Sequence, residues 1–138
     1  MFVDIKKRIY EPEVGEIISY AALEGSPEGV AKEAATYLSS DNLFFYGWVE
    51  DGRVVGICGY EVFAKMVEIH LISVIKDKQK QGIGSAMVAA LQTMYILPLH
   101  AETVDEAVGF YRKLGFDVTS FPHHEWGVKY SCISNIDN

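Results

Sequence analysis

The sequence predicts an α+β fold, in which helices flank a central, mostly antiparallel sheet. Runs of β-branched and aromatic residues, typical of strands, alternate with stretches whose apolar residues have helical spacing. One helical stretch lies between two strand-like runs, which indicates a single strand–helix–strand crossover in an otherwise antiparallel arrangement. The chain of 138 residues has the length of one domain, and we expect residues 1–138 to form a single domain.

The first third of the chain is expected to contribute one short strand and two helices. The strand lies within residues 2–9, where charged residues separate the apolar ones. A helix then begins near Pro12 and continues to about Leu23. For the second helix, residues 27–38, Ser26 is a suitable N-cap, and the proline at the first position fits the opening turn. The predicted buried side of this helix consists of Val30, Ala31, Ala34, Ala35 and Leu38.

The middle of the chain is expected to form a three-stranded antiparallel meander. Asp51-Gly52 is the strongest hairpin signal in the sequence, because both residues tolerate the positive φ of a type I′ turn. Gly56 and Gly59, inside the returning strand, indicate bulges or places where another segment approaches the backbone closely. The three predicted strands are Leu43 to Glu50, Arg53 to Phe63 and Met66 to Ile75.

After one further helix, the chain is expected to form a short strand, a last helix and a final pair of strands. The last helix is predicted at residues 105–114, with Thr103 as N-cap, Glu106 completing a capping box and Gly115 ending the helix. Residues 135–138 are expected to be frayed. The predicted buried side of the last helix consists of Ala107, Val108, Phe110, Tyr111 and Leu114. The three strands are Ile96 to Ala101, Phe116 to Phe121 and Gly127 to Ile133.

Charge and composition argue against several classes of partner. The net charge of −7 disfavours binding to nucleic acids and to anionic membrane surfaces. No run reaches the roughly 18 apolar residues of a membrane span, and the N-terminus lacks the basic-then-apolar order of a secretory signal. We therefore expect a cytoplasmic protein with no nucleic-acid or membrane partner.

No metal site is predicted. Cys58 and Cys132 lie within predicted strands without C-x-x-C spacing, and we expect both to be buried and reduced. His123, His124 and Glu125 are metal-ligating types, but adjacent side chains usually point apart, and no further ligand is signalled.

The segment between the strand ending at Ile75 and the next helix has the layout of a phosphate-binding loop, Gln79-x-x-Gly82-x-Gly84. Glycines let a ligand approach the backbone, and the first N–H groups of a helix have no intrahelical acceptor and favour an anion. The sequence lacks the P-loop motif G-x-x-x-x-G-K-[ST], and no third glycine completes the dinucleotide fingerprint G-x-G-x-x-G. On this segment alone, an ordinary glycine turn before a helix remains an alternative.

The loop resembles the pyrophosphate-binding signature Q/R-x-x-G-x-G/A of the Gcn5-related N-acetyltransferase (GNAT) family. The later segment Phe110-Tyr111-Arg112-Lys113-Leu114-Gly115-Phe116 resembles a second signature of that family, F-Y-x-x-x-G-F. The resemblance covers residues 67–116 by motif and the rest by element order, and it implies the GNAT fold, whose central strands splay apart to admit the coenzyme. The chain departs from the family at Lys76, where proline is frequent, and at Val104, where an asparagine often contacts the pantetheine.

The resemblance implies acetyl-coenzyme A as co-substrate and assigns residues to its binding. Strand amides would pair with the pantetheine, the glycine loop would hold the pyrophosphate, and the Tyr111 motif would lie beside the sulfur. The residues assigned in this way are Ile72, Ser73, Val74, Gln79, Lys80, Gln81, Gly82, Ile83, Gly84, Ser85, Ala107, Phe110 and Tyr111.

Three residues are candidates for catalysis. In the family, a tyrosine at the position of Tyr111 can protonate the departing thiolate. The alternative is that Tyr111 only packs in the core as an aromatic residue. A base is also needed, because an amine must lose a proton to attack a thioester. Strand alternation would place Glu68, His70, Ile72 and Val74 on one face, which makes Glu68 and His70 candidates for the base. A solvated glutamate, a packed histidine and a base supplied by water remain alternatives.

The sequence thus predicts an acetyl-coenzyme A-dependent N-acetyltransferase that transfers the acetyl group directly to an amine. The acceptor class stays open between an amine-bearing small molecule, a protein N-terminus and a lysine side chain. By resemblance, the first two helices and the loop at residues 122–126 border the acceptor cleft, and a homodimer is one oligomeric state to consider. The alternatives are a coenzyme A-binding sensor or interaction module, and an acyltransferase for a longer acyl group.

Overall fold

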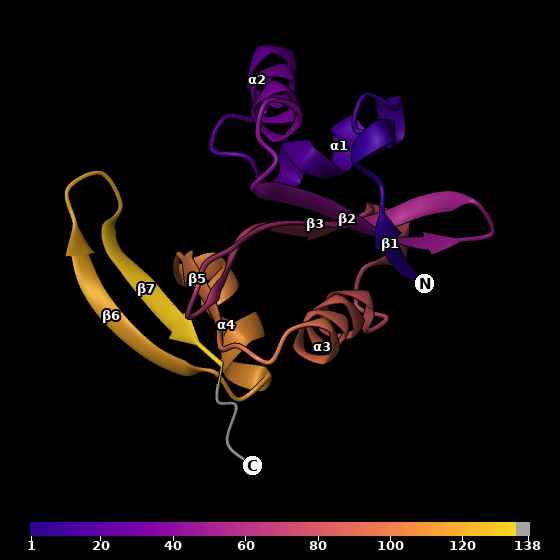
Figure 1. Cartoon of the computed structure of the whole chain (residues 1–138). Coiled ribbons are helices and arrows are strands. Elements are labelled where there is room, and N and C mark those ends of the chain that lie inside the picture. The colour runs from indigo at the N-terminus through magenta and orange to yellow at the C-terminus, as the bar shows by residue number, and fades with distance from the viewer. Residues whose placement is uncertain (135–138) are drawn as a thin grey trace.

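The computed structural model describes residues 1–134 and confirms the mixed α+β fold with a mostly antiparallel sheet (Figure 1). The elements are β1 (Phe2–Asp4), α1 (Pro12–Ala21), α2 (Pro27–Leu38), β2 (Leu43–Glu50), β3 (Arg53–Val62), β4 (Val67–Val74), α3 (Ile83–Met94), β5 (Leu99–Thr103), α4 (Asp105–Lys113), β6 (Asp117–His123) and β7 (Gly127–Ile133), with 3-10 turns η1 (Lys6–Arg8) and η2 (Lys76–Lys78). The strands form one seven-stranded sheet in the order β1-β2-β3-β4-β5-β7-β6, in which β4 and β5 are the parallel pair. The predicted fraying of residues 135–138 lies outside the described residues.

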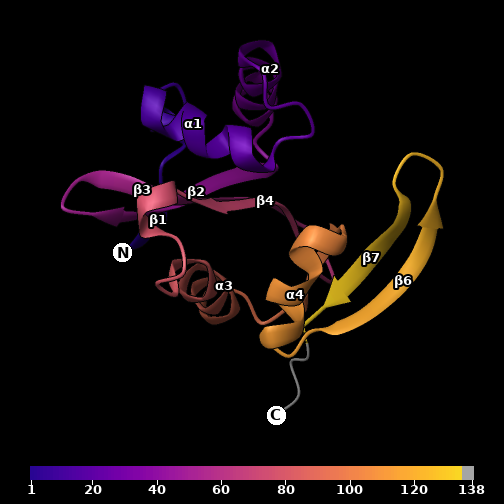
Figure 2. The same ribbon diagram turned by 180° about the vertical axis from the view of Figure 1, so that it is seen from behind.

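Helices cover both faces of the sheet, but not over its whole width (Figures 1 and 2). On one side, α1 packs on β3 and β4, and α2 packs on β2. On the other side, α3 packs against β2, β3 and β4, while α4 packs against β6 and β7. Within residues 1–134, the face of β5, β7 and β6 that points away from α4 therefore carries no helix. None of the helices described is long and apolar enough to cross a membrane.

Two glycines of β3 let helices approach the sheet from opposite sides. A Cβ atom on Gly56 would lie 3.0 Å from the Cε atom of Met87 in α3. A Cβ atom on Gly59 would lie 2.1 Å from the hydroxyl oxygen of Tyr37 in α2, closer than any real contact. The prediction that these glycines mark close approaches is confirmed.

The buried side of α2 differs from the predicted one. Tyr37 is 2% exposed and packs inward together with Ala34, whereas Ala35 is exposed and Leu38 is 45% exposed. The helix is therefore turned so that a tyrosine, rather than the stripe of alanine and leucine, meets the sheet. The large ring fills the space that Gly59 leaves open. Its burial removes more apolar area from water, and so stabilises the fold more, than burial of smaller apolar side chains would.

The start of α4 also differs from the prediction. Thr103 is not its N-cap, because it pairs with Tyr130 in the β5–β7 ladder. The N-cap is Val104, which makes no side-chain capping bond, so the predicted capping box with Glu106 does not form. In addition, β5 begins at Leu99, three residues later than predicted. Cys58 and Cys132 are free and buried, as expected.

A bulge in β4 shapes the region where the sheet opens. Gly59 pairs with Leu71, and the next residue of β3, Tyr60, pairs with Ile69. His70 is therefore an extra residue in β4, which shifts the in–out alternation of side chains by one position.

The bulge corrects the predicted common face of Glu68, His70, Ile72 and Val74. Ile72 and Val74 pair with Cys58 and Gly56, and Gly56 faces α3. Glu68 pairs with Glu61 on the opposite face of the sheet. Strict alternation ends at the bulge, so the four residues do not share a face.

Candidate functional site

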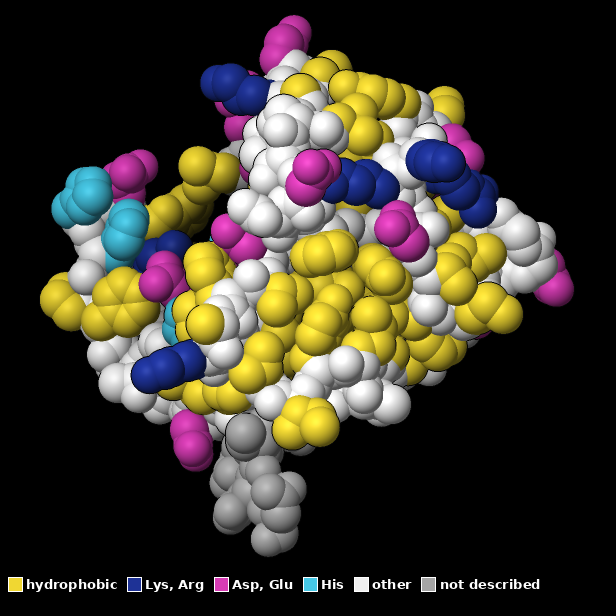
Figure 3. Space-filling model, viewed as in Figure 1, with side chains coloured by type: hydrophobic (Ala, Val, Ile, Leu, Met, Phe, Trp, Pro, Cys, Tyr) yellow, Lys and Arg dark blue, Asp and Glu magenta, His cyan; other side chains and the backbone are white. Residues whose placement is uncertain are grey.

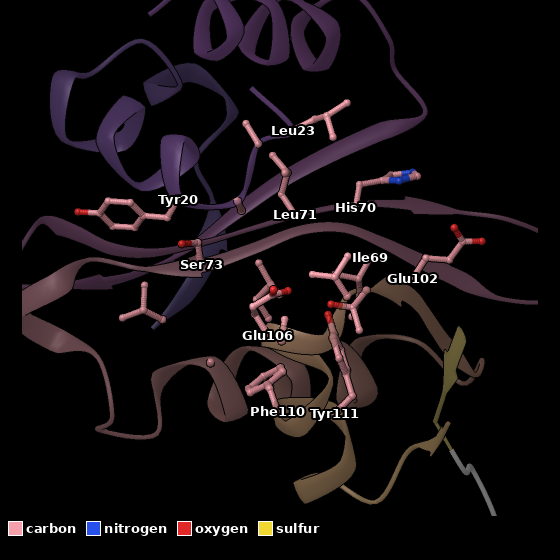
Figure 4. Close-up of a pocket in the computed structure, with 18 of the residues that line it drawn as sticks. Tyr20, Leu23, Ile69, His70, Leu71, Ser73, Glu102, Glu106, Phe110 and Tyr111 are labelled. Carbon is pink, nitrogen blue, oxygen red and sulfur yellow. The ribbon is translucent and has the colours of Figure 1, made fainter. Parts of the chain in front are cut away.

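A cleft of about 1700 Å³ opens where β4 separates from β5 (Figure 4). The two parallel strands pair only at Val67–Leu99, Glu68–His100 and Ile69–Ala101. Beyond the last pair, β4 continues to Val74 with no β5 residue beside it. Backbone groups of this segment that point toward β5 are free to pair with an extended ligand, as a further strand would.

The loop before α3 forms one end of this cleft. Gly82 is the N-cap of α3 and has a φ of 83°, a conformation that glycine adopts without strain. The first backbone bond of the helix joins the N–H group of Ala86 to the carbonyl of Gly82. The N–H groups of Ile83, Gly84 and Ser85 precede that bond, so they have no intrahelical acceptor and favour an anion together with the helix dipole.

Side chains from three parts of the chain hold the loop in place. The guanidinium of Arg53 bonds Glu13 of α1 at 2.9 Å and Asp77 of η2 at 3.0 Å, and the bond from Arg53 lowers the pKa of Asp77. The side-chain nitrogen of Gln79 donates to the carbonyl of Val74 at 2.9 Å. The loop is thereby fixed relative to the end of β4, which keeps the anion site in line with the open strand edge.

Tyr111 projects from α4 into the middle of the cleft, with its hydroxyl pointing toward β4 (Figure 4). The residue is 4% exposed, and its ring lies 5.0 Å from that of Phe110 and 5.2 Å from that of Phe116. No hydrogen bond to its hydroxyl is found among residues 1–134, and no fully buried polar side-chain atom there lacks a partner, so this oxygen is open to a ligand in the cleft. Burial, with smaller contributions from Cys58, Cys132 and Glu68, raises the pKa of the phenol above its ordinary value.

The two candidates for the base lie in different surroundings. His70 lines the cleft, is 40% exposed, and has its Nε2 atom 3.0 Å from the carboxylate of Glu61. Glu68 does not line the cleft. Its carboxylate lies 2.6 Å from Nδ1 of His100, whose Nε2 atom lies 2.8 Å from the hydroxyl of Ser131. His70 therefore lines the same cleft as Tyr111, whereas Glu68 lies outside the cleft lining, although its charge contributes to the raised pKa of Tyr111.

The cleft lining away from the loop includes acidic and aromatic side chains, together with Lys113 and Lys129. It contains Glu33 and Tyr37 of α2 and Glu61 of β3, together with further acidic and aromatic residues of the second half of the chain. Glu33, Tyr37 and Glu61 lie in no motif, so the sequence did not predict them as site residues. The signal that could have found Tyr37 was Gly59, whose missing side chain makes room for it. The further residues are Glu102, Glu106 and Trp126.

Most of the predicted site residues line the cleft. Gln81 does not line it; its side-chain nitrogen lies 3.4 Å from the carbonyl of Asp77. Trp126, from the loop expected at the acceptor entrance, lines the cleft. In the described part of the chain no group of three or more metal-ligating side chains is assembled, and this includes the turn with His123 and His124. The predicted residues that line the cleft are His70, Ile72, Ser73, Val74, Gln79, Lys80, Gly82, Ile83, Gly84, Ser85, Ala107, Phe110 and Tyr111.

Known proteins match both the sequence and the fold. An N-acetyltransferase in the lysA 3′ region of Bacillus methanolicus, itself uncharacterized, is 29% identical over 90 residues, which cover 64% of this chain and 75% of the relative. Solved structures share the fold as well. An aminoglycoside 6′-N-acetyltransferase from Enterococcus faecium superposes with a TM-score of 0.80 at 14% identity, over 100% of this chain and 98% of its own. The ribosomal-protein-S18-alanine N-acetyltransferase from Escherichia coli superposes with a TM-score of 0.72 at 17% identity, over 96% of this chain and 90% of its own.

The family is shown by the sequence itself. Residues 41–118, more than half of the chain, match the model of the acetyltransferase (GNAT) domain. This segment contains the glycine loop, the open edge of β4 and the Tyr111 motif, which together form the cleft. The chain therefore belongs to the GNAT family of N-acetyltransferases.

Proposed function

We propose that this protein transfers the acetyl group of acetyl-coenzyme A directly to an amine. The observation that carries the proposal is the buried side chain of Tyr111, whose hydroxyl has no partner among residues 1–134 and is open to the cleft between β4 and β5. A thioester in this gap is reached by the coenzyme from the side of α3 and α4, and by the amine from the side of α1 and α2. A protein of the same fold, with a TM-score of 0.76 at 15% identity, was solved with coenzyme A, which supports this choice of co-substrate.

The coenzyme would lie along residues already fixed by the fold. The pyrophosphate would accept hydrogen bonds from the amides of residues 82–85, with Lys78 and Lys80 close by in the cleft. The pantetheine would pair with the open edge of β4 at Ile72, Ser73 and Val74. The sulfur would then lie near Tyr111, where a proton donor is needed.

In the proposed reaction, the amine nitrogen forms a bond to the thioester carbonyl carbon, and the carbon–sulfur bond breaks. The departing thiolate takes the proton of Tyr111, which the phenol regains from water afterwards. The amine proton passes to His70. When Nε2–H of this imidazole donates to Glu61, its Nδ1 atom has a free lone pair to accept a proton. Glu68 is the weaker candidate, because His100 occupies its carboxylate.

Release of free coenzyme A thiol, measured across a panel of amines, tests the proposed function. We expect thiol release that requires an amine and is matched by an equal amount of acetylated amine. Thiol release without an amine, or binding without turnover, would instead indicate a coenzyme A-binding sensor. Faster turnover with a longer acyl-coenzyme A would indicate a different acyltransferase.

Substitution of Gly82 by alanine is expected to weaken coenzyme binding. Acetyl-coenzyme A at about 100 times its dissociation constant should stabilise the wild-type protein by about 2.7 kcal/mol. A Cβ atom at Gly82 meets no protein atom within 4 Å, so it would fill space beside the loop amides. A tenfold loss of affinity would reduce the stabilisation to about 1.4 kcal/mol, which a thermal-shift titration can measure.

Gly52→Ala is a matched control for this variant. Gly52 has a φ of 80°, also has open space around it, and lies in the β2–β3 turn, outside the cleft. Both variants carry the same backbone strain, so both should lose similar stability without ligand. If acetyl-coenzyme A stabilises both variants equally, the loop is not the pyrophosphate site.

A further inference from the structure

We propose that the preferred acceptor is a small diamine or polyamine, whose second cationic group is bound by Glu33, Glu61 and the hydroxyl of Tyr37. This inference specifies the substrate of the proposed N-acetyltransferase and depends on it. It rests on the charge of the cleft, on the surroundings of Tyr37 and on the protonation state that the reaction requires.

The two ends of the cleft carry opposite charge. Lys78 and Lys80 lie at the loop before α3, where phosphate is expected. Away from the loop, the lining has carboxylates on α2, β3 and β5, and Figure 3 shows acidic side chains, with a basic one among them, around the hollow between the helices above the sheet and the β6–β7 hairpin. Ion pairing neutralises this end only in part: Glu102 lies 3.6 Å from Lys129, and Glu61 lies 3.0 Å from Nε2 of His70, while Glu33 has no ion-pair partner within residues 1–134.

Tyr37 provides a second, independent sign of a ligand at this end. The residue is 2% exposed, and no hydrogen bond to its hydroxyl is found in the described part of the chain. No fully buried polar side-chain atom there lacks a partner, so this oxygen is reached from the cleft that Tyr37 lines. The hydroxyl end of the ring lies against Gly59, in space that a Cβ atom at this position would occupy. Burial first, and then the charges of Glu33 and Glu61 among others, raise the pKa of this phenol. The oxygen of this hydroxyl can accept a hydrogen bond from an ammonium group, while the carboxylates of Glu33 and Glu61 balance the charge of that group.

The reaction itself requires that this cation be a second group on the acceptor. The nitrogen that attacks the thioester must be neutral, so it gains little from carboxylates in the transition state. A second ammonium keeps its charge throughout and is stabilised by the acidic end while the first nitrogen reacts. A simple monoamine, or a peptide whose only amine is the reacting one, has no such group.

A matched pair of amines tests the proposal. We expect kcat/KM for 1,4-diaminobutane to exceed that for 1-aminobutane by about ten- to hundredfold, the effect of one hydrogen-bonded charge. Glu33→Gln and Tyr37→Phe should each lower the value for the diamine by about tenfold or more and leave the monoamine unchanged. Glu61 is left intact in this test, because it also contacts His70. Glu28→Gln is the control, since Glu28 is an exposed residue of α2 outside the cleft.

Equal kcat/KM values for the two amines would overturn the proposal. A higher kcat/KM for a peptide that has a free N-terminus and no charged side chain would overturn it as well. Equal slowing of both amines by Glu33→Gln would overturn it as well. If no amine is acetylated, the proposed function fails, but titration of both amines into the protein–coenzyme A complex still decides the inference. At least tenfold tighter binding of the diamine would support the acidic end as a cation site, and equal binding would refute it.

Discussion

Replacing Tyr111 by phenylalanine is expected to lower kcat for acetyl transfer by about 10²–10⁴-fold, the usual contribution of a general acid. The substitution keeps the ring between Phe110 and Phe116 and removes only the hydroxyl, so the packing of α4 should be preserved. The affinity for acetyl-coenzyme A should change little, because the loop before α3 is untouched. Steady-state thiol release together with a thermal-shift titration separates the two quantities.

Tyr130→Phe provides the control for this experiment. Tyr130 donates its hydroxyl proton to Asp105 of α4 and does not line the cleft, so its variant should retain full activity. Full activity of Tyr111→Phe as well would mean that Tyr111 serves in packing only.

The pH dependence of the wild-type enzyme provides a second check on Tyr111. Burial raises the pKa of this phenol above the ordinary value of about 10, so the group keeps its proton to higher pH. The acid form is thus present throughout the neutral range, and kcat should show no falling limb from this group below about pH 10. A falling limb at lower pH that disappears in Tyr111→Phe would contradict the assignment.

His70→Gln is expected to produce the second large loss, again about 10²–10⁴-fold near neutral pH, where the wild-type imidazole is neutral and can accept the amine proton. Glutamine can still hydrogen-bond Glu61 but cannot take up a proton at neutral pH. The loss should diminish as pH rises, because a growing fraction of the amine is then neutral without assistance. The measurement is the pH–rate profile of His70→Gln against that of the wild type.

Glu68→Gln is the comparison that separates the two candidates for the base. Because the Glu68 carboxylate is hydrogen-bonded to His100 and lies outside the cleft, its variant should lose much less activity. The reverse ranking would move the role of base to Glu68. Profiles close to that of the wild type for both variants would mean that water accepts the proton.

The parts of the site that the sequence predicted are those built from contiguous residues. The loop from Gln79 to Ser85 has glycines at fixed spacing, and the strand and helix on either side follow from local apolar patterns. Tyr111 was found in the same way, because its helix carries a recognisable motif. Local sequence determines such segments, and the fold adds only their relative positions.

The parts that were missed depend on contacts between distant segments. The bulge at His70 arises from the register between β3 and β4, and no residue type in β4 signals it. Tyr37 was overlooked since its apolar neighbours in α2 formed an equally good stripe, and only the space above Gly59 decides between them. The acidic end combines single glutamates of separate elements, which no spacing along the chain brings together.

The short pairing between β4 and β5 has a consequence for the lifetime of the protein. Within the sheet, three residue pairs, Val67–Leu99, Glu68–His100 and Ile69–Ala101, join β1 to β4 with β5 to β7. A coenzyme lying in the gap would contact both parts of the sheet. Its binding would therefore increase the free energy needed to separate them. Cells with little acetyl-coenzyme A would then hold a larger opened fraction, which proteases degrade, so enzyme abundance would follow coenzyme supply.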